Sequence, residues 1–128
     1  MPETQNNLNN EQNLQKSLFD IATESWRLKK TFERVLNLLD AKEKQKNLSK
    51  LNWFEKKLKD SLEEAGYKFV NFEGQPFATG IPANPINIED FDSDENLYVK
   101  QTIEPTILDK NGVILRTGTI MLDKAEKE

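Results

Sequence analysis

An apolar seam between Leu14 and Leu39 constrains the fold of this chain more than any other part of its sequence. At alternating spacings of four and three residues, apolar side chains fill every position of the seam except Ser25. This spacing is typical of a helix that buries one narrow stripe. Such a helix is roughly 40 Å long and needs a partner helix, from the same chain or from a second copy. The apolar members of the seam are Leu14, Leu18, Ile21, Leu28, Phe32, Val35 and Leu39.

A second line of side chains widens this seam on one side. It consists of Phe19, Ala22, Trp26 and Leu36. A strict two-stranded coiled coil has a narrower apolar face than the two lines make together. The pattern therefore suits a helical bundle at least as well as a simple coiled coil.

A second helix is predicted after a polar segment at 41–47, which is either a solvated continuation of a helix or a loop. Its seam also has three-four spacing, with Glu55 as the polar member. Asn47 or Ser49 is positioned to cap its start, and Gly66 is the expected left-handed stop. We expect both seams to form a helical dimerisation module over 14–66. The expected dimer interface contains the apolar members of the first seam and three members of the second. The apolar seam residues of the second helix are Leu48, Leu51, Leu58, Leu62 and Ala65, of which Leu51, Leu58 and Leu62 are the predicted interface residues.

The pattern changes after Gly66, and residues 67–122 are predicted to form a small β domain. Its chain is rich in β-branched and aromatic residues broken by glycine, proline and acidic turns. Four to six short antiparallel strands are expected, so the predicted fold class is α+β, a helical bundle followed by a β domain. The expected segments are a strand at 67–72, an extended loop at 77–88 with strand fragments at Ile86 and Ile88, a strand at 97–108 interrupted by Pro105, a hairpin turn at 109–112 and a return strand at 113–122.

Both ends of the chain are polar. Residues 1–13 are rich in Asn and Gln and are expected to be a disordered tail or a frayed extension of the first helix. Residues 123–128 are expected to be a charged tail. No signal peptide is visible and no stretch approaches the roughly 20 apolar residues of a membrane span. The sequence therefore predicts a soluble cytoplasmic protein that does not act on membranes.

Composition argues against an enzyme. The chain has no cysteine and no histidine, which removes the commonest nucleophile, general base and metal ligands. Asp90, Asp92 and Asp94 alternate as in a calcium loop, but Glu95 and Gln101 stand where that loop needs Gly and Glu. We therefore expect no catalytic residues, no metal and no cofactor.

The charge of the chain is unevenly distributed. Residues 1–66 carry 12 basic and 11 acidic side chains, whereas residues 67–128 carry 6 basic and 11 acidic ones. Phosphate binding needs clustered Lys and Arg, so the acidic half argues against a nucleic-acid partner. It suits a basic protein partner instead.

Three segments, in this order, are similar to the GrpE family, the nucleotide exchange factors of DnaK-type chaperones. LEEAGYKFVNFEGQPF at 62–77 resembles the junction at which a family helix ends at Gly and leads into a strand. The extended loop after Phe77 resembles an Asp-Pro-Asn segment, although Ala78-Thr79-Gly80 departs from it. NGVILRTGTIML at 111–122 resembles the closing hairpin, while QTIEPTIL at 101–108 replaces an aromatic and glycine-rich stretch. The helices are shorter than in the family.

This resemblance implies a mechanical function. Family members dimerise through their helices and lay the β domain against the chaperone's nucleotide-binding domain, which weakens ADP affinity by favouring an open cleft. The partners implied are a DnaK-type chaperone and a second copy of the chain. The alternative is a non-enzymatic dimeric scaffold that presents an acidic β module to another protein. By position, the expected partner contacts are Pro76, Phe77, Ile81, Pro82 and Arg116. Phe77 and Ile81 are equally suited to the β core, and Arg116 is better suited to a solvated strand.

Overall fold

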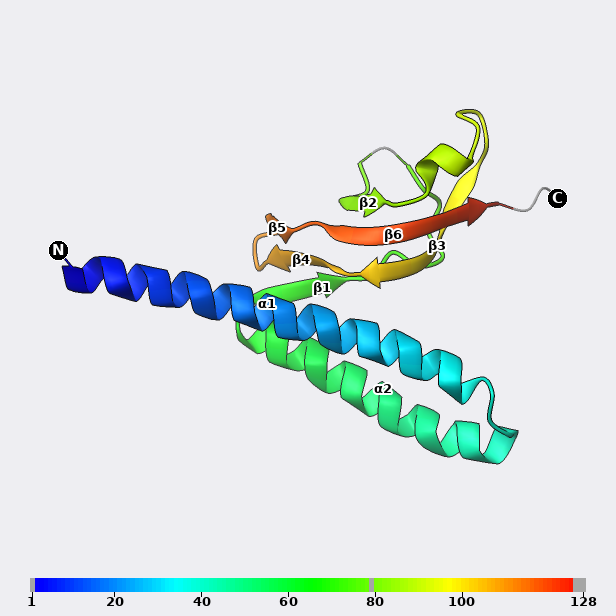
Figure 1. Ribbon diagram of the computed structural model, residues 1–128, viewed down its shortest axis with the longest axis horizontal. Helices are drawn as coiled ribbons and strands as arrows, with labels where there is room; N and C mark the ends of the chain where they lie inside the picture. Colours follow the sequence, from blue (N-terminus) through cyan, green and yellow to red (C-terminus); the bar gives the residue numbers. More distant parts are fainter. Residues whose placement is uncertain (1, 79, 126–128) are drawn as a thin grey trace.

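The computed structural model describes residues 2–78 and 80–125, with side chains from residue 9 onward. Helices α1 (Pro2–Leu36) and α2 (Ala41–Glu64) run in opposite directions as a hairpin. All of the strands follow the helices in sequence, and they form a β domain on one side of the hairpin (Figure 1). The predicted α+β fold class, two helices followed by a small β domain, is confirmed.

The helix boundaries resolve the alternatives left open by the sequence. Because α1 begins at Pro2, residues 2–13 extend the helix and are not a disordered tail. The helix ends at Leu36, earlier than expected, and Leu39 lies in the connection to α2. The carboxylate of Asp40 accepts a hydrogen bond from the Glu43 amide at 2.9 Å and caps α2, so residues 41–47 are helical.

The predicted N-cap of α2 was therefore wrong. Asn47 and Ser49 lie inside the helix, and their side chains donate to the carbonyl oxygens of Glu43 and Gln45 at 2.8 and 3.3 Å. The predicted stop is confirmed, because Gly66 has a φ of 93° and its amide donates to the Glu63 carbonyl at 2.9 Å. The chain enters its first strand directly after this glycine.

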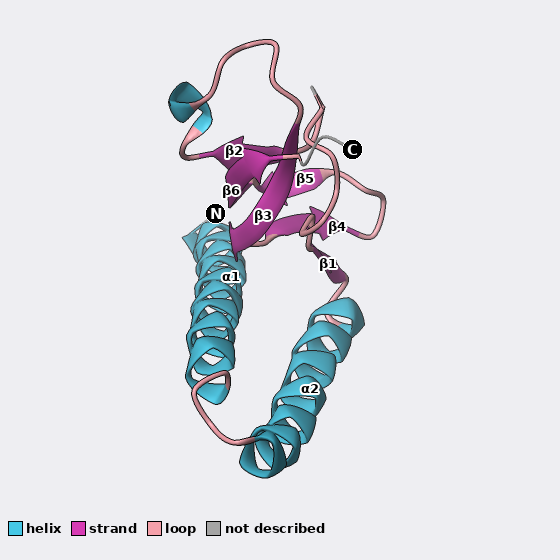
Figure 2. Cartoon of the chain, turned by 90° about the vertical axis from the view of Figure 1, so that its right-hand side faces the viewer, coloured by secondary structure: helices cyan, strands magenta, loops and turns pink. Residues whose placement is uncertain are grey.

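The β domain consists of two three-stranded sheets. One has the order β1-β4-β5 and the other β2-β6-β3 (Figure 2). The strands are β1 (Tyr67–Val70), β2 (Ala83–Pro85), β3 (Leu97–Glu104), β4 (Thr106–Asp109), β5 (Ile114–Arg116) and β6 (Gly118–Lys124).

Both long predicted strands are broken, and each break moves the chain from one sheet to the other. Pro105 separates β3 from β4, and Thr117 separates β5 from β6. Segments 97–109 and 114–124 thus form one antiparallel ribbon that bends at Pro105 and Gly118. A Cβ at position 118 would lie 2.7 Å from the Thr106 backbone nitrogen, so only glycine fits at this bend. The Thr106 hydroxyl also accepts a hydrogen bond from the Gly118 amide at 2.9 Å.

Strand β2 corrects two expectations. It pairs in parallel with β6, so the β domain is mostly rather than wholly antiparallel. The predicted fragments at Ile86 and Ile88 were wrong, because Ile88 begins the short 3-10 helix η1 (Ile88–Asp90). Asn87 lies between the two isoleucines. Its side-chain amide donates to the Leu122 carbonyl and accepts from the Leu122 amide, both at 2.9 Å. These bonds occupy the edge of β6 with which a longer β2 would have to pair.

The predicted C-terminal tail is partly strand, because β6 continues through Asp123 and Lys124. Residues 126–128 of that tail, and residue 1 of the N-terminal tail, lie outside the described residues.

Two buried clusters form the core. The first joins both helices to the β1-β4-β5 sheet, and its members are Phe19, Ala22, Trp26, Leu62, Phe69 and Ile107. The second fills the β domain around the other sheet, and its members are Phe72, Ala83, Val99, Ile120 and Leu122. Because the first cluster contains side chains of both regions, the β domain is packed onto the helices rather than tethered to them.

Candidate functional site

The apolar seam of α1 is left uncovered by the rest of the chain. The side chains of Leu14, Ile21 and Leu28 are 71%, 65% and 68% exposed. We call the exposed seam residues the α1 stripe: Leu14, Ile21, Leu28, Phe32, Val35 and Leu39. A row of exposed large apolar side chains along one helix is typical of a protein interaction surface.

The core of the chain uses the second line instead. Phe19, Ala22 and Trp26 are 4%, 1% and 0% exposed and face α2 and the β domain. On a helix of 3.6 residues per turn this line lies about a third of a turn from the α1 stripe. One helix therefore has two apolar faces: the second line packs against its own chain, and the α1 stripe is exposed.

Four predicted interface residues require correction because they pack within the chain. Leu51 and Leu62 are 7% and 1% exposed. Leu18 and Leu58 are partly buried against the cluster that contains Leu62. Their burial provides the partner that α1 and α2 need within a single chain, and of the predicted interface residues those of the α1 stripe stay exposed.

Polar side chains meet where α1 crosses α2. Lys29 is 6% exposed, and its ammonium nitrogen lies 3.0 Å from Glu33 Oε1 and 3.1 Å from Glu55 Oε1. The same nitrogen lies 4.7 Å from the ring centroid of Trp26. Glu55, the polar member of the second seam, thus faces a buried lysine. This ion pair fixes the register of the two helices.

The pKa of Glu55 lies below its ordinary value of 4.5. Burial by itself raises this pKa, but the hydrogen bond and charge of Lys29, followed by Lys59, outweigh burial. The folded chain therefore binds the Glu55 proton less readily than the unfolded chain does. The resulting stabilisation is present above pH 4.5 and is lost as the pH falls through the folded-state pKa.

Glu55→Gln is expected to lower the free energy of unfolding at pH 7 by about 1–3 kcal/mol, because buried Lys29 loses one of its two carboxylate partners. The difference from the parent chain should shrink as the pH falls from 4.5 towards the lower folded-state pKa of Glu55, because Glu55 itself is protonated there. Urea denaturation at pH 7 and at pH 3.5 measures both effects. Glu63→Gln, at an exposed position of the same helix, is the matched control and should change little. An equal loss in both variants would contradict the role given to Glu55.

Three of the polar contacts between α1 and the β domain involve the Trp26 indole or a charged pair, and two of these three converge on β3. The indole nitrogen of Trp26 donates to the carbonyl oxygen of Thr102 at 2.9 Å. Glu73 accepts from the Thr102 amide at 2.9 Å and pairs with Lys30 at 2.7 Å. Burial lowers the pKa of Lys30, but the hydrogen bond and charge of Glu73 outweigh burial and raise it above 10.5. This contribution to stability is present below pH 10.5 and is lost as the pH rises through the folded-state pKa.

The third contact involves Arg116, one of the predicted partner-binding residues. Its guanidinium lies 3.0 Å from the Asp20 carboxylate and 5.4 Å from the ring centroid of Phe19, so it faces α1. Hydrogen bonds from Lys16 and then Arg116 lower the pKa of Asp20. Arg116 is half-buried and is engaged within the chain, so its contact with a partner stays a prediction.

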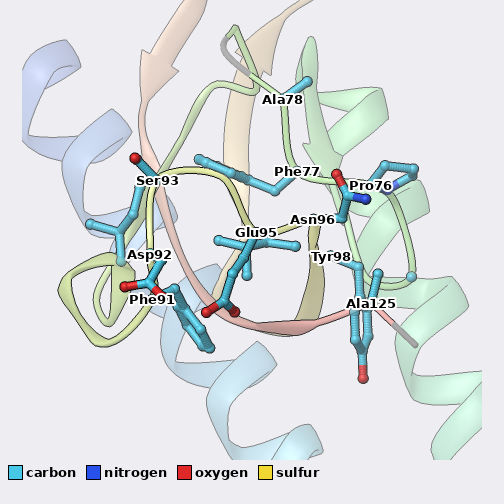
Figure 3. A pocket seen from close by; sticks show the side chains of 13 residues that line it. Pro76, Phe77, Ala78, Phe91, Asp92, Ser93, Glu95, Asn96, Tyr98 and Ala125 are labelled. Atoms are coloured by element: carbon cyan, nitrogen blue, oxygen red, sulfur yellow. The ribbon is translucent and has the colours of Figure 1, made fainter. Parts of the chain in front are cut away.

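The other predicted partner-binding residues lie in the loop between β1 and β2. Pro76 pairs with Tyr98 of β3, and the Phe77 amide donates to the Leu97 carbonyl at 2.9 Å. Both line the same cavity, shown in Figure 3. Ile81 packs on the second core cluster, and the Pro82 carbonyl accepts from the Thr106 hydroxyl. The structure thus brings Pro76 and Phe77 together at a surface cavity, whereas Ile81 and Pro82 support the core beside it.

The sequence alone did not reveal the polar contacts that join α1 to α2 and to the β domain. Lys29, Lys30 and Glu73 belong to no recognised sequence motif, and Thr102 lies in a segment that was predicted only to be a strand. The one available signal was Glu55, whose place in an apolar seam requires a cation opposite it. In the described part of the chain, no three acidic side chains converge to hold a metal ion. Neither helix, over its described residues, has a stretch long and apolar enough to cross a lipid bilayer.

Comparison of the chain with protein-family models, with curated proteins and with solved structures gives no match.

Proposed function

We propose that this chain is a GrpE-like cochaperone that dimerises through α1 and binds the nucleotide-binding domain of a DnaK-type chaperone through its β domain, promoting ADP release. The observation that carries the proposal is one helix with two apolar faces. The second line packs against α2 and the β domain, and the α1 stripe is exposed and available to a second copy. The helix-helix-β order, the junction at 62–77 and the return segment at 111–122 support the family resemblance.

The proposed mechanism needs a rigid connection and no catalytic side chain. A protein that binds the open form of a cleft better than the closed form shifts the equilibrium towards release of the nucleotide. The Trp26–Thr102, Lys30–Glu73 and Arg116–Asp20 contacts resist rotation of the β domain against the helices. As part of this proposal, the protein works in the cytoplasm beside its chaperone.

A second candidate is a non-enzymatic dimeric scaffold that presents the β domain to another protein. It is favoured by the charge of the segment between Lys68 and Lys100, which contains six acidic residues and no Lys or Arg. Such a surface attracts a basic protein whether or not nucleotide exchange follows.

Release of a fluorescent ADP analogue from the host's DnaK-type chaperone tests the proposal. We expect acceleration of about tenfold or more, lost in Phe77→Ala. Phe54→Ala on α2, whose ring is 38% exposed, is the matched control and should accelerate release as the parent chain does. Circular dichroism verifies that both variants are folded. Binding without acceleration would support the scaffold, whereas the absence of both binding and acceleration would contradict the cochaperone proposal.

A further inference from the structure

A cavity of about 670 Å³ opens at the surface of the β domain. Three segments line it, and the lining residues are Gly74, Pro76, Phe77 and Ala78, then Ile88, Phe91, Asp92, Ser93, Glu95, Asn96, Leu97 and Tyr98, and finally Ala125. Its size lies in the range of ligand-binding pockets. Three separate segments of the chain build it, and β3 holds them together through the Pro76–Tyr98 pair. The cavity is therefore part of the folded β domain and not a gap beside one loose loop.

The walls of the cavity combine aromatic rings with carboxylates. Phe77, Phe91 and Tyr98 contribute the rings, and Asp92 and Glu95 contribute the carboxylates. In Figure 3 the side chain of Glu95 reaches into the middle of the group, with Phe91 on one side and Tyr98 on the other. Aromatic faces and carboxylates both attract cations, so the two kinds of wall favour the same ligand.

Glu95 has unused capacity to accept hydrogen bonds. Its Oε2 is shielded from water and receives no hydrogen bond among the described residues. The Lys124 ammonium approaches this oxygen only to 3.5 Å, and that lysine side chain is 63% exposed. A shielded carboxylate oxygen without a donor is costly. A cation with N–H groups entering the cavity would supply the missing bond.

The segment that supplies most of the lining carries charge of one sign, and the Lys124 ammonium approaches it at Glu95 from β6. Five of the seven residues from Glu89 to Glu95 are acidic, and no Lys or Arg occurs between Lys68 and Lys100. A ligand approaching this end of the β domain therefore meets a negative potential, which raises the association rate of cations and lowers that of anions. Charge complementarity thus selects a positively charged occupant.

We propose that this cavity binds an arginine or lysine side chain of a partner protein, with the alkyl stem against the aromatic rings and the charged group at Glu95. The inference rests on the proposed function only in that the β domain binds a protein. Pro76 and Phe77, the loop residues expected to contact a partner, lie on the rim of the same cavity. A partner that contacts this rim would thus have the cavity within reach of a basic side chain.

Short peptides test the site on the intact chain without any chaperone. Acetyl-Gly-Arg-Gly-amide and acetyl-Gly-Lys-Gly-amide are titrated into the ¹⁵N-labelled protein, with acetyl-Gly-Gln-Gly-amide as the neutral probe. We expect saturable amide shifts confined to Phe77, Ala78 and 91–98 for the basic peptides and none for the neutral one. Glu95→Gln should weaken binding by about tenfold. Asp94→Asn removes the same charge next to the cavity without lining it and should weaken binding less than about twofold.

Each contrary result is decisive. Equal weakening by Asp94→Asn would show diffuse attraction to acidic residues and overturn the proposal, as would equal binding of the neutral peptide or the absence of a saturable shift. The ADP-release assay separates this inference from the proposed function. Peptide binding without exchange activity would count against the cochaperone alone, whereas exchange that persists while the peptides fail to bind would count against the cavity alone.

Discussion

Replacing Trp26 with alanine is expected to lower the free energy of unfolding by about 3–5 kcal/mol. The indole is fully buried, packs edge to face against Phe69 at 6.1 Å between ring centroids and bonds the Thr102 carbonyl. Its loss leaves a cavity between the helices and the β domain, an unpaired carbonyl and a buried Lys29 without its aromatic neighbour. Urea denaturation followed by far-UV circular dichroism measures the loss.

Two further variants show how much of this loss of stability comes from the N–H donor and how much is specific to Trp26. Trp26→Phe keeps a ring but removes the N–H donor, so about 1–3 kcal/mol should be lost. Trp53→Ala is the matched control, because this second tryptophan is 64% exposed on α2 and its removal should change stability by about 0.5 kcal/mol. Equal losses from Trp26→Ala and Trp53→Ala would contradict the assignment of Trp26 as the joint between the two regions.

Leu28→Asp is expected to abolish self-association while leaving the fold of the single chain intact. Leu28 is 68% exposed in the centre of the α1 stripe, so the aspartate is solvated in the monomer. In a dimer formed through the α1 stripe it would be buried without a partner, which weakens association by about 3–5 kcal/mol. Light scattering at micromolar concentration should give the mass of two chains for the parent and 14.8 kDa for the variant.

The control for this prediction adds the same charge to the same helix. Thr31 is exposed on α1 beside Leu28 in space but outside the α1 stripe, so Thr31→Asp should remain dimeric. Circular dichroism of both variants verifies that the helices persist. A parent chain that is already monomeric, or an unchanged mass for Leu28→Asp, would refute dimerisation through this face.

Hydrophobic periodicity predicted both helices, but it did not predict which of the two apolar faces of α1 packs against the rest of the chain. The exposed seam from Leu14 to Leu39 is longer and more regular than the buried line of Phe19, Ala22 and Trp26. Periodicity reports that a face is apolar, and it contains no information on which surface covers that face. The larger aromatic side chains face the core because they fill the space between α2 and the β domain, a volume that no local pattern specifies.

The candidate site was less accessible to sequence reasoning than the fold. Pro76 and Phe77 were predicted as contact residues from their resemblance to a family loop, and the structure places both at the cavity. Glu95 was considered only as a mismatch in a calcium loop, because its meeting with Phe91 and Tyr98 depends on how three segments pack. Arg116 faces α1 through Asp20, a long-range pairing that no spacing in the sequence encodes.

The bend at Pro105 and Gly118 has a consequence for how the β domain opens. Each sheet takes one strand from either arm of the ribbon and a third from the chain before it, so the strands of the two sheets are interleaved along the chain. Local unfolding that removes one arm breaks both sheets at once. The β domain therefore opens as a single cooperative unit, and a ligand held by one sheet protects the amides of both from hydrogen exchange.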